Sequence, residues 1–164
     1  MSGVTIPRDN KLLENVGNDI KPLELDSLTF VLFGATGDLA KRKIFPSLFN
    51  LFLDEKMPNS FTIVGLGRRE WSDEIFQQHV EKSLLTFSKR FKISDASKIK
   101  KFLNRFHYSP LDVTDNDGYK QVLEMIQTRE KELSIPENRL FYLSVAPEFF
   151  DVISLNIKKS GLGA

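Results

Sequence analysis

The sequence predicts an α/β protein with a doubly wound parallel sheet of the Rossmann type and helices on both faces of the sheet. Short apolar runs alternate with longer segments of helical periodicity along most of the chain. The first two runs are apolar on both alternating faces, as strands buried on both sides must be. The first run also leads through a glycine-containing turn into a helix.

The first half of the chain predicts one strand-helix-strand unit. Residues 1–26 mix charge, proline and glycine without a sustained period, and we expect a flexible arm there. A buried strand is predicted over Leu28–Phe33 and a second over Phe61–Gly67. The segment Leu39–Lys56 between them has helical spacing, although Pro46 is expected to kink or break its start.

The next part of the chain predicts two helices and a third strand. Ser72 is a candidate cap for a helix that extends to about Lys89, because its hydroxyl can accept hydrogen bonds from first-turn amides. A further helix is expected over Ala96–Phe106. The sheet then resumes with HYSPLDV, residues 107–113.

The last part predicts a fourth strand between two helices. Thr114 is the expected cap of a helix over Asp115–Leu133, and Pro147 suits the first position of a final helix. The strand between them is predicted over Leu140–Ala146. Right-handed crossovers then give the strand order 3-2-1-4, which leaves this fourth strand unpaired on its outer edge. We see no strand after the last helix, so the sheet is expected to stop before the later strands of the fold.

Composition limits the classes of function. The chain has 164 residues, of which 27% are charged, a net charge of +1, no cysteine and two histidines. We therefore expect one folded domain over residues 27–164, with no thiolate metal site, no global attraction to nucleic acid and no membrane segment. The absence of a signal-like segment predicts a cytoplasmic protein.

The segment FGATGDLAKRK is the main candidate for a ligand site. Gly34 and Gly37 fall between a buried strand and a helix, where backbone amides and the positive helix end can hold a pyrophosphate. The pattern departs from G-x-G-x-x-G, because Thr36 replaces the middle glycine and Leu39 the last. A simple glycine turn is the alternative.

Three consecutive cations follow this turn. Lys41, Arg42 and Lys43 lie near the positive end of the helix, where cations are disfavoured unless something negative is bound. Successive helical residues point about 100° apart, so the three cannot all face one ligand. An ordinary solvated charge run is the alternative.

The end of the second strand favours NADP over NAD. NAD-binding domains usually carry an acidic residue there, which accepts hydrogen bonds from the ribose 2′-hydroxyl. Here Arg68 and Arg69 occupy that place, and the planar guanidinium suits a 2′-phosphate. The arginines can also simply begin a solvated loop, with Glu70 neutralising one of them.

Residues at the ends of the third and fourth strands are further candidates. Asp112 and Val113 are expected to lie against the adenine, and Tyr108 to stack or hydrogen-bond near the cofactor. The nicotinamide ribose is expected beside the end of the fourth strand. The residues there are Ser144, Val145 and Ala146.

Four segments of the chain resemble glucose-6-phosphate dehydrogenases in order and spacing, from about Leu28 to the end. They are FGATGDLAKRKIFPSLFNL, IVGLGRREW, FHYSPLDVTD and NRLFYLSVAPEFF. The resemblance implies an enzyme that oxidises C1 of glucose 6-phosphate to the lactone and passes the hydride to NADP, the first step of the pentose phosphate pathway. It also implies a homo-oligomer for the full-length form.

The resemblance assigns roles to residues of this chain. Lys43 matches a lysine associated with the sugar phosphate substrate. The resemblance and the strand-turn-helix pattern together predict a set of nucleotide contacts. These are Gly34, Ala35, Thr36, Gly37, Asp38, Leu39, Arg68, Arg69, Tyr108, Asp112, Val113, Ser144, Val145 and Ala146.

The catalytic part of the family pattern does not occur in this chain. Its E-K-P segment and its R-I-D-H-Y-L-G-K motif are absent. His79 and His107 are expected to have surface or structural roles, so we name no catalytic residue. We expect the catalytic β+α domain to be missing and the chain alone to be inactive.

Two other functions compete with this one. A short-chain or epimerase-like NADP oxidoreductase also often opens with GATG, but its Y-x-x-x-K pair is absent. The three tyrosines are followed four places later by Asp112, Leu123 and Ala146. The second alternative is a nucleotide-binding or interaction module without catalysis.

Overall fold

The computed structural model describes residues 4–5, 27–92 and 95–163, and it confirms the predicted parallel sheet. The strands are β1 (Val4–Thr5), β2 (Leu28–Phe33), β3 (Phe61–Gly67), β4 (Phe106–Pro110) and β5 (Arg139–Leu143). Their spatial order is β1-β5-β2-β3-β4, with β2 to β5 parallel. The four parallel strands therefore have the predicted order 3-2-1-4.

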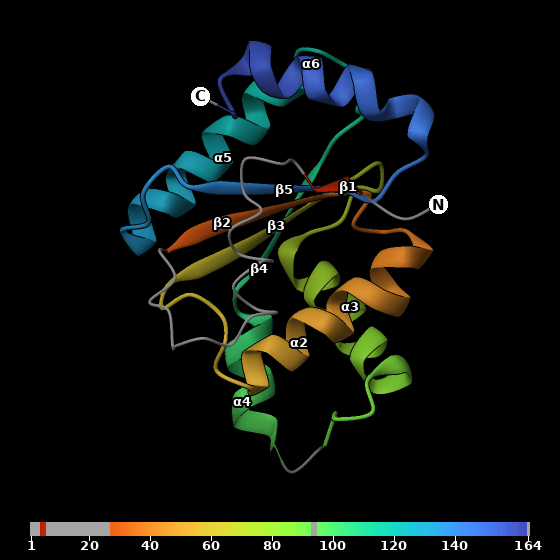
Figure 1. Ribbon diagram of the computed structural model, residues 1–164, viewed down its shortest axis with the longest axis vertical. Helices are drawn as coiled ribbons and strands as arrows, with labels where there is room; N and C mark the ends of the chain where they lie inside the picture. Colours follow the sequence, from red (N-terminus) through yellow and green to blue (C-terminus); the bar gives the residue numbers. More distant parts are fainter. Residues whose placement is uncertain (1–3, 6–26, 93–94, 164) are drawn as a thin grey trace.

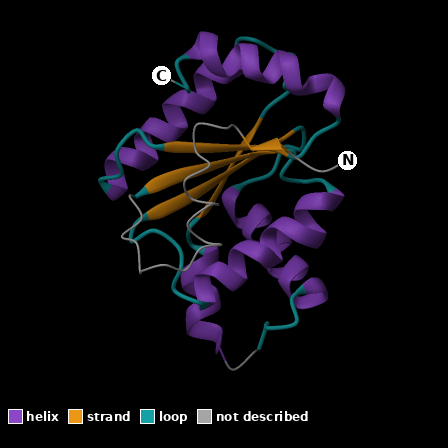
Figure 2. Ribbon diagram, viewed as in Figure 1, coloured by secondary structure: helices purple, strands orange, loops and turns teal. Residues whose placement is uncertain are grey.

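Helices cover both faces of this sheet (Figure 1, Figure 2). One face carries a π-helical turn (Ala40–Ile44) that continues into α2 (Phe45–Leu53), together with α3 (Asp73–Phe87) and α4 (Ala96–Leu103). The other carries α5 (Gly118–Leu133) and α6 (Phe150–Ser160), with a 3₁₀ turn over Pro147–Phe149 before α6. The expected start of the last helical segment at Pro147 is confirmed.

The strand β2 shows why its apolar run has no polar face. Phe30 and Leu32 belong to the core beneath α2, α3 and α4, whereas Val31 and Phe33 belong to the core beneath α5 and α6. All four side chains are buried. Alternate residues of a strand point to opposite faces, so a strand between two helical layers must be apolar throughout.

Local hydrogen bonds confirm one of the expected helix starts and correct another. Ser72 caps α3 as predicted, because its hydroxyl oxygen accepts the Ile75 N–H at 3.2 Å. Thr114 does not cap α5, since its N–H and its hydroxyl both donate to the Asp112 carboxylate, at 3.0 and 2.7 Å. This turn delays the start of α5 to Gly118.

At both edges of the sheet, some of the outward backbone N–H and C=O groups have hydrogen-bond partners. The prediction that the fourth strand lacks an outer partner is wrong at two positions, because Val4 and Thr5 pair antiparallel with Leu143 and Tyr142. The flexible arm predicted over residues 1–26 otherwise lies outside the described residues, and these two residues form a strand instead.

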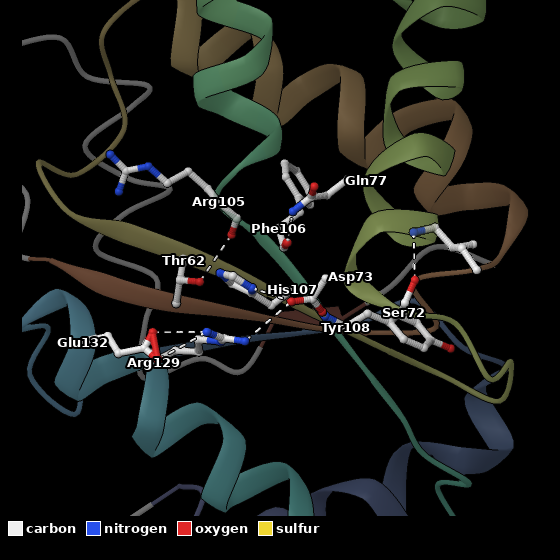
Figure 3. Close-up of polar contacts among 11 residues, drawn as sticks. Thr62, Ser72, Asp73, Gln77, Arg105, Phe106, His107, Tyr108, Arg129 and Glu132 are labelled. Carbon is white, nitrogen blue, oxygen red and sulfur yellow. Dashed lines mark hydrogen bonds and ion pairs between the residues drawn. The ribbon is translucent and has the colours of Figure 1, made fainter.

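Side chains of α3 satisfy the opposite edge, at β4 (Figure 3). The Asp73 carboxylate accepts the Tyr108 N–H at 2.8 Å, and the Gln77 amide donates to the Phe106 carbonyl at 2.9 Å. An edge strand whose backbone groups already have partners is a poor template for another chain.

The helix after β2 does not break at Pro46, because a π-helical turn precedes the proline. The Phe45 N–H donates to the Ala40 carbonyl, five residues back. Proline has no N–H, so the Lys41 carbonyl receives no bond from position 46. The buried hydroxyl of Ser83, on α3, donates to that carbonyl instead.

Ser83→Ala is therefore expected to destabilise the chain by about 1 to 3 kcal/mol, because it leaves the Lys41 carbonyl without a donor. Urea denaturation measures the loss. Pro46→Ala restores an amide at position 46, so the same serine substitution should cost less in that background. An equal cost in both backgrounds would contradict the proposed link between Ser83 and the proline.

A buried ion pair joins the amino end of β5 to α5. The Arg139 guanidinium donates to both carboxylate oxygens of Glu130, at 2.9 and 2.7 Å, and to the Leu162 carbonyl at 2.9 Å. The Thr29 hydroxyl, on β2, also donates to Glu130 at 3.2 Å. The side chains of the pair are 4% and 5% exposed. The cluster ties the last helical layer to the sheet, on the side opposite the strand ends considered next.

Candidate functional site

The turn after β2 needs glycine at position 34. Gly34 has φ of +80°, and a Cβ added there would lie 1.9 Å from the Ser144 carbonyl oxygen. The Gly34 and Ala35 amides both donate to the Leu66 carbonyl, at 2.9 and 3.0 Å. The turn is thus held between the carboxyl ends of β3 and β5, where a doubly wound sheet binds its ligands.

Backbone donors are available where the turn enters the helix. The first helical hydrogen bond runs from Lys41 N–H to the Gly37 carbonyl at 3.3 Å. The amides of Asp38, Leu39 and Ala40 precede it and have no acceptor within the helix. Such amides, together with the helix dipole, suit a phosphate group.

The predicted loop residues play different parts in this turn. Ala35 is fully buried and its amide is already used, so it shapes the turn and offers a ligand nothing. Its Cβ lies 2.8 Å from where a side chain at Gly65 would begin. Thr36, Gly37 and Leu39 are half-buried and Asp38 is exposed. These four positions therefore face the accessible side of the turn.

A carboxylate of the same segment, that of Asp38, pairs with two of the three consecutive cations. Asp38 accepts a 2.8 Å hydrogen bond from Arg42 and lies 3.9 Å from the Lys41 ammonium. Arg42 also lies over the Phe87 ring, 5.2 Å from its centroid. Within the described residues, exposed Lys43 has no ion pair or ring partner. Lys43 is thus the cation of the three that is available to a ligand.

A pocket of about 510 Å³ lies beside the carboxyl ends of β3 and β4. It brings together Arg68 and Asp112, which the sequence had placed at the ends of neighbouring strands. The Thr114 hydrogen bonds hold the pKa of Asp112 below its usual range, and the Arg68 charge lowers this pKa further. The lining residues are Arg68, Glu70, Ser109, Pro110, Leu111, Asp112, Asp115, Asp117, Gly118 and Gln121.

Charges in this pocket are unevenly distributed. Arg68 is the cation among the lining residues, whereas carboxylates come from four of them. A phosphate is therefore favoured at the Arg68 end, and donor groups such as hydroxyls or an amine elsewhere. Asp115, Asp117 and Gln121 were not predicted to line a pocket. A carboxylate near a helix start usually serves as a cap, and an exposed glutamine on a helix carries no signal of its own.

The two adjacent arginines are directed to different places. Arg69 does not line the pocket, because its guanidinium lies over the Trp71 ring, 5.8 Å from the centroid. The described structure has no ion pair between Glu70 and either arginine. Arg68 is therefore the stronger candidate for the 2′-phosphate contact.

Tyr108 lies under the loop after β3 and does not line the pocket. It is 6% exposed, its ring packs beside Trp71 and Phe76, and its hydroxyl donates to the Arg69 carbonyl at 2.6 Å. Burial, followed by the negative charge of Glu70, raises its pKa to about 12. The hydroxyl therefore remains a donor at neutral pH.

Both histidines have structural partners. His107 Nδ1 lies 2.9 Å from the Asp73 carboxylate, which Tyr108 and Arg129 also approach (Figure 3). His79 packs against the Phe45 and Trp71 rings, and burial lowers its pKa. Neither lines the pocket.

Residues expected to end the fourth strand lie just beyond β5. The Ser144 N–H donates to the Phe33 carbonyl at 2.9 Å, and its buried hydroxyl has no hydrogen-bond partner in the described structure. Val145 contacts the position that a Gly34 side chain would occupy, whereas Ala146 is exposed. Ser144 and Val145 are thus neighbours of the glycine turn, as the fold predicts.

Val113 also lies outside the strand that was expected to contain it. Its carbonyl accepts the Tyr119 hydroxyl at 2.8 Å, and its side chain packs against the core beneath α5 and α6. The buried Tyr119 therefore fixes the backbone next to Asp112, at the wall of the pocket.

Two further features of the described residues bear on the type of site. They contain no cluster of three histidine or carboxylate side chains suited to a metal ion. The helices found there are all too short or too polar to cross a lipid bilayer.

Comparison with known proteins gives a consistent set of relatives. The family model for "Glucose-6-phosphate dehydrogenase, NAD binding domain" matches residues 31–164. Glucose-6-phosphate 1-dehydrogenase of Bacillus subtilis is 42% identical over 135 residues, which are 82% of this chain and 26% of that protein. The enzyme of Leuconostoc mesenteroides is 40% identical over 130 residues, 79% of this chain and 26% of the enzyme. The chain thus spans about a quarter of these relatives.

A solved structure supports the same comparison. It is described as glucose-6-phosphate dehydrogenase in complex with its substrate glucose-6-phosphate. The match has a TM-score of 0.75 and 29% identity, and it covers 84% of this chain and 28% of the other. The fold of this chain therefore matches part of a solved glucose-6-phosphate dehydrogenase.

Proposed function

Because the chain belongs to the glucose-6-phosphate dehydrogenase family, we propose that it is the NADP-binding domain of an enzyme that oxidises glucose 6-phosphate to the lactone. The sugar phosphate is the substrate of the relative whose complex has been solved. The observation that carries the cofactor proposal is Arg68, placed in a pocket at the end of β3 where NAD-binding domains usually have an acidic residue.

The residues of the glycine turn fit a dinucleotide. Gly34 permits the close backbone approach, and the amides of Asp38, Leu39 and Ala40 are free to bind the pyrophosphate. Arg68 would hold the 2′-phosphate, with the adenine end of the nucleotide near Asp112 and Val113. The unpartnered hydroxyl of Ser144 suits the ribose at the other end.

The bound nicotinamide would supply hydride acceptance. This chain's own residues would bind and orient the nucleotide, and Lys43 would attract the phosphate of the sugar. Both histidines are engaged in structural contacts, and the Asp38 carboxylate in the turn already accepts a hydrogen bond from Arg42. A proton acceptor must come within about 3 Å of the reacting hydroxyl. We therefore propose that the chain alone binds nucleotide without turnover.

Arg68→Ala is expected to weaken NADP binding about tenfold to a hundredfold and to leave NAD binding nearly unchanged. The reason is that NAD lacks the phosphate with which a charge-assisted hydrogen bond forms. Calorimetric titration of both nucleotides measures the effect.

Arg69→Ala is the matched control, because it removes the same charge from a side chain directed at Trp71. It should reduce the affinity for NADP much less. Equal losses for NADP and NAD in Arg68→Ala, or none for either, would refute the assignment of NADP. The four carboxylates around the pocket make NAD binding through its ribose hydroxyls the competing outcome.

A further inference from the structure

We propose that Tyr108 is a positioning residue for nucleotide preference, which holds Arg68 toward the pocket without touching the nucleotide. This inference rests on the proposed function, since it explains how one arginine of an adjacent pair is directed to the 2′-phosphate. A buried tyrosine would then contribute to the preference for NADP over NAD, which the sequence pattern attributes to the arginines alone.

The Tyr108 hydroxyl lies close to Gly67 and Arg69, the residues on both sides of Arg68. It donates to the Arg69 carbonyl at 2.6 Å. It also lies 3.0 Å from the position that a Gly67 side chain would occupy. Glycine at position 67 thus leaves room for the hydroxyl to reach the residue after Arg68.

This hydrogen bond and the packing of Trp71 against the core hold an otherwise exposed loop. Arg68, Arg69 and Glu70 are all exposed, and within the described residues no other hydrogen bond reaches the backbone of residues 68–71. The Arg69 guanidinium over Trp71 turns that side chain away from the pocket. With Arg69 held on one side, Arg68 points to the other, where it lines the pocket.

The Tyr108 side chain is itself held by packing and hydrogen bonds, so it can fix the position of the Arg69 carbonyl. Its ring packs against those of Trp71 and Phe76, with centroids 5.7 and 5.3 Å away. Its amide donates to Asp73, and its strand pairs with β3 (Figure 3). An arginine whose conformation is set before binding loses less entropy when it contacts a phosphate.

Tyr119 provides a matched control on the opposite wall of the pocket. Its hydroxyl is also a buried donor to a backbone carbonyl, that of Val113, at 2.8 Å. Val113 lies next to Asp112, near the proposed adenine, which NADP and NAD share. Loosening this wall should therefore affect the two nucleotides equally.

The test compares Tyr108→Phe, Tyr119→Phe, Arg68→Ala and the double variant Tyr108→Phe/Arg68→Ala, by calorimetric titration with NADP and with NAD. Tyr108→Phe should weaken NADP binding about threefold to tenfold and change NAD binding less than about twofold. Because Tyr108 acts through Arg68, the double variant should bind NADP as weakly as Arg68→Ala alone.

The outcomes separate this inference from the proposed function. Additive losses in the double variant, equal losses for both nucleotides in Tyr108→Phe, or undiminished NADP affinity in that variant would each overturn the role of Tyr108 alone. No NADP binding by the unmodified chain, or no effect of Arg68→Ala, would overturn the proposed function together with it.

Discussion

Arg139→Ala is expected to cost about 3 to 5 kcal/mol of stability. The substitution leaves the Glu130 carboxylate buried without its cation, and it removes the donor to the Leu162 carbonyl. Since domains are stable by only about 5 to 15 kcal/mol, the variant should be partly unfolded at room temperature. Urea denaturation followed by circular dichroism measures the change.

Two further variants distinguish burial from ion pairing. Arg90→Ala breaks a pair with Asp54 at a similar distance, 2.9 Å, but both side chains are 44% exposed, so little measurable loss is expected. The double replacement of Glu130 and Arg139 by methionine should recover much of the stability, because no charge is then left buried alone. If Arg139→Ala costs no more than Arg90→Ala, the buried cluster does not stabilise the fold more than an exposed ion pair does.

Gly34→Ala is expected to cost about 2 to 5 kcal/mol and to abolish nucleotide binding. The backbone at φ of +80° disfavours any side chain, and the new methyl group would overlap the Ser144 carbonyl at 1.9 Å. The ends of β2 and β5 must then move apart, which displaces the first-turn amides proposed to bind the pyrophosphate. Urea denaturation and NADP titration measure the two effects.

Gly37→Ala is the control in the same turn. Its φ is not positive, and an added Cβ would meet only the Gly34 carbonyl, at 3.3 Å. It should cost much less stability than Gly34→Ala. Comparable losses at the two glycines would mean that the loop yields easily, and would contradict the close packing of Gly34 against β5.

Several parts of the fold could be predicted from the sequence because their causes are local. The apolar run Leu28–Phe33 and the glycine turn after it are neighbours in the chain, and their junction has one natural outcome in a doubly wound sheet. The Ser72 cap depends on an amide three residues away. The strand order 3-2-1-4 followed from the doubly wound fold that the alternating strands and helices predict.

Other features could not be predicted, because their causes lie far away in the chain. Glu130 occurs in an apolar stripe with Tyr119, Val122 and Ile126, which hints at a buried charge, but only the folded chain places Arg139 against it. The two-residue strand on β5 likewise depends on a segment more than a hundred residues away.

The sequence by itself determined the fold, the family resemblance and the position of the glycine turn. Only the tertiary structure decided which of two adjacent arginines faces the pocket. Arg68 and Arg69 have the same chemistry, and nothing local tells them apart. Their directions depend on Trp71 and on Tyr108, which comes from a different strand. Packing among such distant residues sets side-chain direction, whereas residue type sets only what the side chain can bind.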